Sequence, residues 1–140
     1  MKAQLFRGDL HYADVTLHTA ASGPVTALDT LWLRLEDQGV IGIGEVRLNI
    51  RYLHGYSEEQ VLNNLLQILS RWDWRRQPAA LLAALHDEDP TLLPPSRMVL
   101  DMALHDLLAR QEGVSVAAWL GAQAGLPAWR TNQTLFWSSE

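Results

Sequence analysis

The sequence contains no cysteine, which excludes disulfide bonds and thiolate metal sites. It also lacks a run of basic residues, and its 11 basic and 16 acidic residues give a net charge of −5. A protein that binds a phosphate backbone carries a basic patch, so we expect no nucleic-acid partner. No apolar run approaches the ~20 residues of a membrane span, and the N-terminus is too polar for a signal peptide. We therefore expect a cytoplasmic protein with no membrane partner.

The residues that are present favour one globular domain. The chain has 140 residues, of which 48% are hydrophobic, and this is enough to bury a sizeable core. Six tryptophans are many for this length. Because large aromatic side chains often bury at interfaces, they indicate that the domain contacts another surface.

The first half of the chain predicts an antiparallel sheet. Three stretches are expected to be strands: Ala3 to Tyr12, Thr26 to Glu36 and Val40 to Leu48. In the second stretch Leu31, Leu33 and Leu35 alternate with polar or aromatic residues, which is the period of a strand with one buried face. Asp37-Gln38-Gly39 predicts a hairpin turn in which glycine supplies the positive dihedral angle. Three strands joined in this order form a meander.

The second half of the chain predicts helices. Four stretches are expected to be helical: Ser57 to Leu69, Ala79 to His86, Pro94 to Gly113 and Val116 to Leu120. Ser57 with Gln60 three residues later is typical of a capping box. The helix after Pro94 has such a wide apolar stripe that most of its sides must be buried. Strands followed by helices indicate an α+β fold, with a helical bundle on one face of the meander.

Two motifs, in this order, resemble a known family. The first is Gly42-Ile43-Gly44-Glu45 in the third strand, and the second is SRMVLDMALHDLLARQEGVSVAAWLG, which starts at Ser96 and ends at Gly121. Together they resemble the N-terminal capping domain of the enolase superfamily, in the branch of mandelate racemase and muconate lactonizing enzyme. His105 departs from the pattern, because this branch commonly has tryptophan there. Glu45 is interpreted as a structural carboxylate that accepts bonds from loop backbone N–H groups.

The resemblance implies two parts, with the capping domain over residues 1–128 and the start of a truncated (β/α)8 barrel over residues 129–140. Arg130 to Phe136 would be the first barrel strand. Family members abstract a proton α to a carboxylate, with Mg²⁺ stabilising the enolate and lysine or histidine acting as bases. These groups belong to a barrel of roughly 200 or more residues, and Lys2 is the only lysine here. We expect the chain alone to be inert, with no catalytic residue and no metal ligand of its own.

The resemblance also implies a role in substrate selection, because two capping-domain loops close over the barrel mouth and exclude water. By position these loops are Tyr12 to Val25 and Asn49 to Tyr56. The residues predicted to contact a small carboxylate substrate are Leu17, His18, Ile50, Arg51, Tyr52, His54 and, on the barrel strand, Thr134. Arg51 can pair with a carboxylate in a bidentate manner. The competing interpretation of Arg51 is a solvated loop charge or an interface ion pair.

Two alternatives stay open. The chain can be a free-standing, non-catalytic interaction module that oligomerises, or the parent enzyme can be an acid-sugar dehydratase of the same family. The surface that would meet the barrel should be apolar and uncovered, which predicts self-association as a homo-oligomer. The sequence does not identify the carboxylate substrate.

Overall fold

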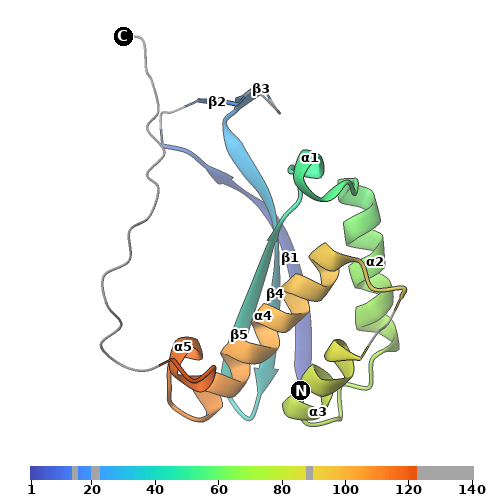
Figure 1. Ribbon diagram of the computed structural model, residues 1–140, viewed down its shortest axis with the longest axis vertical. Coiled ribbons are helices and arrows are strands. Elements are labelled where there is room, and N and C mark those ends of the chain that lie inside the picture. The colour runs from blue at the N-terminus through green and yellow to red at the C-terminus, as the bar shows by residue number, and fades with distance from the viewer. Residues whose placement is uncertain (14–15, 20–22, 88–89, 123–140) are drawn as a thin grey trace.

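The computed structural model describes residues 1–13, 16–19, 23–87 and 90–122. A three-stranded antiparallel sheet is formed by β1 (Lys2–His11), β4 (Ala27–Asp37) and β5 (Val40–Arg47), with β4 in the centre (Figure 1). The predicted meander is confirmed. The predicted loop between its first two strands is wrong in part, because β2 (Leu17–Thr19) and β3 (Gly23–Val25) pair there as a short antiparallel ribbon.

The register of β4 explains its alternating sequence. Leu31, Leu33 and Leu35 are fully buried on one face, while Trp32 and Arg34 lie on the other. In the turn to β5, Gln38 and Gly39 have φ angles of 51° and 81°. Positive φ at both central residues matches the twist of the flanking strands. Gln38 therefore shares the left-handed conformation that was predicted only for Gly39.

Five helices follow the sheet in the part of the chain that the structure describes. They are α1 (Arg51–His54), α2 (Glu58–Arg71), α3 (Pro78–His86), α4 (Pro94–Gln111) and α5 (Val116–Trp119). The last four confirm the predicted helices, whereas α1 lies in a stretch predicted to be a loop. The capping box of α2 is also confirmed, because the Ser57 hydroxyl accepts from the N–H of Gln60 while the Gln60 amide oxygen accepts from the N–H of Ser57.

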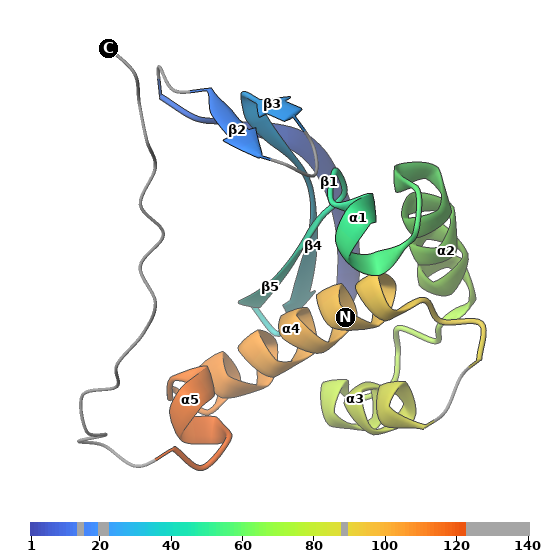
Figure 2. The same ribbon diagram turned by 45° about the horizontal axis from the view of Figure 1, so that its top comes forward.

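The helices cover one face of the sheet, with α4 running across it and α2 and α3 beside it (Figure 2). The fully buried apolar side chains come from both layers: Leu31, Leu33, Leu35, Val46 and Leu48 from the strands and the end of β5, and Val61, Leu65, Ile68, Leu81, Leu85, Val99, Leu100, Ala103, Leu104 and Leu107 from the helices. They form one contiguous cluster between the layers. None of the described helices is long and apolar enough to cross a membrane.

The contact between β5 and α4 depends on two glycines. A Cβ added to Gly44 would collide with the backbone oxygen of Val99 and lie 2.9 Å from the backbone nitrogen of Ala103. A Cβ added to Gly42 would collide with the backbone oxygen of Ala103 and lie 2.6 Å from the backbone nitrogen of Leu107. The helix backbone therefore rests directly on the strand, which gives the Gly-x-Gly pattern a packing explanation.

Candidate functional site

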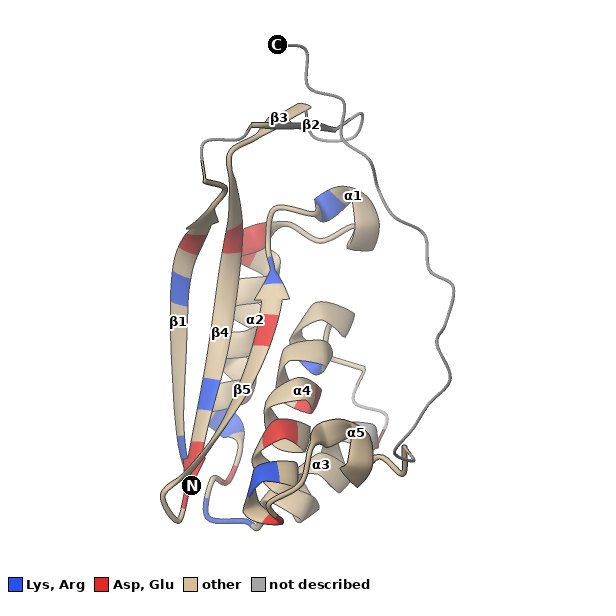
Figure 3. Ribbon diagram, turned by 90° about the vertical axis from the view of Figure 1, so that its left-hand side faces the viewer, with Lys and Arg blue, Asp and Glu red and all other residues tan. Residues whose placement is uncertain are grey.

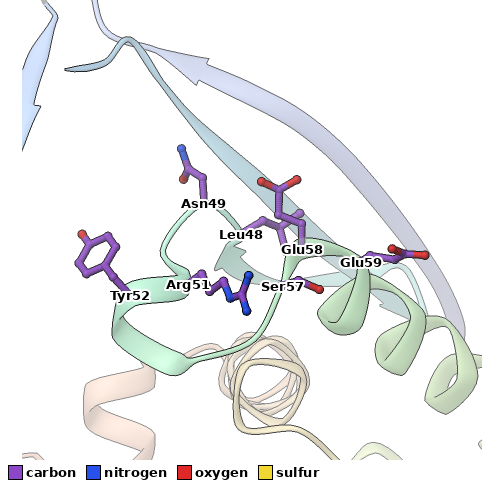
Figure 4. Close-up of a pocket in the computed structure, with 7 residues that line it drawn as sticks. All are labelled: Leu48, Asn49, Arg51, Tyr52, Ser57, Glu58 and Glu59. Carbon is purple, nitrogen blue, oxygen red and sulfur yellow. The ribbon is translucent and has the colours of Figure 1, made fainter. Parts of the chain in front are cut away.

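A pocket of about 580 Å³ lies where β5 ends and α2 begins (Figure 4). Seven residues line it: Leu48, Asn49, Arg51, Tyr52, Ser57, Glu58 and Glu59. The lining combines one guanidinium, two carboxylates and a phenol above a buried leucine. Such a mixture can bind a small polar molecule through a few fixed groups.

The short helix α1 carries the guanidinium and the phenol. It begins after Ile50, whose side chain is half-buried, and it ends at Gly55, whose φ of 82° is the left-handed conformation typical of a helix end. The helix buries no residue, and the Tyr52 side chain is 50% exposed. Arg51 is exposed and makes no side-chain hydrogen bond or ion pair with the residues that the structure describes. Its guanidinium is thus available to a ligand.

His54 is held by its own loop. Its Nδ1 accepts from the backbone N–H of Tyr56 at 3.1 Å, and its ring stacks on the Tyr56 ring with centroids 5.8 Å apart. Nε2 is buried and has no hydrogen-bond partner within the described ranges. The hydrogen bond to Nδ1 requires a neutral ring with the proton on Nε2. His54 does not line the pocket, so its predicted substrate contact stays a prediction.

The structure brings only part of the predicted set together. Arg51 and Tyr52 line the pocket, and Ile50 precedes them as the N-cap of α1. Leu17 and His18 belong to β2, but their side chains fall outside the described residues, as does all of Thr134. The prediction missed the other lining residues: Leu48, Asn49, Ser57, Glu58 and Glu59. The capping box and the acidic first turn of α2 were the available signal for the last three.

An ion cluster borders the pocket on the side of the sheet. Arg7 on β1 donates to Asp29 on β4 through Nε at 3.0 Å, and to Glu58 at the start of α2 through Nη2 at 2.8 Å. The neighbouring carboxylates, Asp29 foremost, raise the pKa of Arg7 further above its already high ordinary value. Figure 3 shows a basic band on β1 a little below the acidic bands on β4 and at the start of α2. The cluster therefore links three elements around one cation.

A second pocket, of about 640 Å³, lies between β5, α4 and α5. It has a mostly apolar lining: Ile43, Met102, Val116 and Leu120, with Asp101, His105 and Asp106. The His105 ring meets the Trp119 ring edge to face, with centroids 5.2 Å apart. Asp106 accepts from the backbone N–H of Ile43 at 2.9 Å and from Arg110 at 2.8 Å. This face pairs exposed apolar groups with carboxylates that are already engaged.

Two further expectations can be compared with the geometry. Glu45 is exposed and accepts from the indole N–H of Trp32 at 3.0 Å, so its partner is a side chain of the neighbouring strand and not a loop backbone. Within residues 1–13, 16–19, 23–87 and 90–122, no group of three His, Asp or Glu side chains is placed to hold a metal ion.

No protein-family model and no curated protein matches the sequence. Solved structures match the fold. An L-Ala-D/L-Glu epimerase superposes with a TM-score of 0.64 at 24% identity, over 87% of this chain and 33% of its own. An enolase-family protein from Agrobacterium tumefaciens, homologous to dipeptide epimerases and holding sodium and L-Ala-L-Glu, gives 0.63 at 22% identity, over 86% and 34%.

An enolase from Bradyrhizobium, complexed with magnesium and mandelic acid, gives a TM-score of 0.61 at 18% identity, over 85% of this chain and 33% of its own. The chain thus spans about a third of the length of each of these three structures. This agrees with the predicted fold, a three-stranded meander with helices on one face. Over the part compared, the chain therefore has the same fold as these three structures.

Proposed function

We propose that this chain is the capping domain of a magnesium-dependent racemase, epimerase or cycloisomerase that removes the proton α to a carboxylate. The observation that carries the proposal is the fold match to about a third of an L-Ala-D/L-Glu epimerase and of two enolase-family proteins, one of them complexed with magnesium and mandelic acid. The described residues offer no cluster that fits Mg²⁺. The ion and the proton-transfer bases would therefore belong to a barrel domain, and the capping domain would select the substrate.

Selection would use the pocket beside α1. Mandelic acid and L-Ala-L-Glu, held by two of the matching structures, both carry a carboxylate. The Arg51 guanidinium is exposed and can bind a carboxylate oxygen pair, while the Tyr52 hydroxyl can donate a further hydrogen bond. When α1 closes on a barrel mouth, the same residues would exclude water and strengthen these contacts.

The barrel would dock on the face made by β5, α4 and α5. Apolar side chains that line the second pocket lie there without cover from the described chain, and they are exposed by 40–62%: Ile43, Met102 and Leu120. Contiguous exposed apolar surface marks an interaction site. The same face is what favours the second candidate function, a free-standing module that assembles with copies of itself.

The DNA that follows the codon for Glu140 tests the proposal. We expect an open reading frame that continues with alternating strands and helices, a Lys-x-Lys-like pair and three spaced acidic residues. A stop codon directly after Glu140 would contradict the enzyme proposal and favour the free-standing module. Acid-sugar dehydration would be distinguished by product analysis of the complete protein with magnesium.

The role of Arg51 is tested separately from the downstream sequence. In a mandelate titration of the chain, Arg51→Gln should abolish the saturable shift of nearby amide resonances, because the variant removes the only guanidinium that lines the pocket among the described residues. Unchanged binding of mandelate by this variant would move the carboxylate site elsewhere.

A further inference from the structure

An anion bound in the pocket beside α1 would lie near more negative than positive side chains. Its lining holds one cation, Arg51, and two carboxylates, Glu58 and Glu59. A carboxylate ligand at Arg51 must compete with these two groups for the guanidinium and is repelled by both. Neutralisation of one of the two carboxylates by another group therefore favours anion binding at Arg51.

Arg7 supplies that neutralising charge from outside the pocket. It is not a lining residue, yet its Nη2 lies 2.8 Å from Glu58, and its Nε and Nη2 also hold Asp29. Glu58 is 51 positions away in the sequence and belongs to a different layer of the fold. Its side chain is 48% exposed, so without Arg7 it would be free to turn toward other cations.

We propose that Arg7 is a positioning residue that sequesters Glu58 and so keeps Arg51 available to an anionic ligand. This inference rests on the proposed function, in which Arg51 binds a small carboxylate. With Arg7 in place, the pocket lining has one carboxylate without an ion-pair partner among the described residues, Glu59, and one guanidinium, Arg51. Without Arg7, Glu58 also lacks a partner, and its carboxylate can then compete with the ligand for the Arg51 guanidinium.

The other role open to Arg7 is a clamp that holds β1, β4 and α2 together. The two roles differ in what Glu58 does once Arg7 has gone. In the clamp role, removing the Glu58 charge as well leaves the clamp broken. In the positioning role, removing that charge restores the availability of Arg51. A double-mutant cycle over Arg7 and Glu58 therefore separates them.

The experiment titrates the full 140-residue chain with mandelate at low salt and follows arginine side-chain Nε–Hε resonances by NMR, the Arg51 signal being assigned with Arg51→Gln. We expect Arg7→Gln to weaken mandelate binding by about two- to fivefold, which is the range of exposed ion pairs. We expect Arg7→Gln with Glu58→Gln to bind mandelate as the unmodified chain does. Arg75→Gln is the matched control, because Arg75 is also ion-paired, to Asp73, and lies outside the pocket.

The outcomes separate the inference from the function on which it rests. If Arg51→Gln leaves mandelate binding unchanged, the proposed site fails and the inference fails with it. If Arg51→Gln abolishes binding but Arg7→Gln behaves as Arg75→Gln does, only the inference is overturned. It is likewise overturned if Glu58→Gln does not rescue Arg7→Gln, since Arg7 then acts as a structural clamp.

Discussion

Gly44→Ala is the substitution that tests the packing of this fold most directly. The added methyl group would collide with the backbone oxygen of Val99 and lie 2.9 Å from the backbone nitrogen of Ala103. Backbone atoms of a helix cannot rotate away as a side chain can. The only relief is a retreat of α4 from β5, because ordinary contacts need about 3.5–4.0 Å.

The size of the effect depends on the packing contacts that are lost when α4 moves away from β5. A gap of about 0.5–1 Å already loses a quarter to a half of the dispersion energy of each contact. The face of α4 toward the core is fully buried along its length: Val99, Leu100, Ala103, Leu104 and Leu107. Overpacking costs about 1–3 kcal/mol in cores that can adjust. Since α4 cannot adjust without losing this face, we expect Gly44→Ala to lower the free energy of unfolding by about 3 kcal/mol or more.

Urea unfolding, followed by far-UV circular dichroism, measures this difference in unfolding free energy. The comparison holds when both proteins show the same dependence of that free energy on urea concentration. Gly8→Ala is the matched control. Its added methyl group would lie 3.3 Å from a ring carbon of Trp32, which is a side chain that can shift, and we expect a change below about 1 kcal/mol. If Gly44→Ala and Gly8→Ala unfold at the same urea concentration, the argument for direct backbone packing is refuted.

Three further predictions follow from the surface. Ser57→Ala should lower the free energy of unfolding by about 1 kcal/mol, because it breaks the capping box of α2; unchanged urea unfolding would contradict this. The Arg75 guanidinium holds the pKa of Asp73 below its usual value, so the ion pair between them is lost only as pH falls through that lowered pKa. Arg75→Gln should therefore raise the pKa of Asp73, which an NMR titration of its carboxyl group measures. The chain should self-associate in sedimentation velocity, and Ile43→Gln with Met102→Gln should leave it monomeric, whereas a monomeric unmodified chain would refute an uncovered docking face.

The sheet and the long helices could be predicted because their sequences carry the period of their buried faces. Leu31, Leu33 and Leu35 repeat every second residue, and all three are fully buried on one side of β4. In α4 the apolar stripe predicted burial on most sides, and the described helix buries eight of its residues. Local patterns succeed here because burial in a layered fold imposes the same period on sequence and structure.

The missed helix α1 and the missed ribbon of β2 and β3 lack such a period. α1 is four residues long, buries none of them and has no side-chain cap, so neither periodicity nor a start signal marks it. The strands β2 and β3 have three residues each, too few to show alternation. Both elements owe their conformation to backbone hydrogen bonds, such as that of the Leu53 N–H with the Ile50 oxygen at 2.8 Å, and to pairing between strands.

Residues of the candidate site could be predicted only where their place along the chain, directly after a strand, indicates that they lie at the pocket. Arg51 and Tyr52, which line the pocket, were predicted because they follow the third strand, at the place where the resemblance puts a pocket loop. The link of Arg7 to Glu58 could not be found in this way. It joins residues 51 positions apart that only the fold brings together, and no spacing rule in the sequence relates an edge strand to the start of a helix.

These contrasts indicate that the chain separates stability from recognition. The interface of β5 and α4 tolerates almost no change, since a single methyl group at Gly42 or Gly44 would meet helix backbone. Arg51, Tyr52 and Leu53 of α1 are exposed, and substitutions of exposed residues usually alter the free energy of unfolding by no more than about 0.5 kcal/mol. Residues on α1 can therefore change while the fold stays the same. For the same reason, the core residues of this sequence reveal its fold, whereas its pocket residues do not identify a ligand.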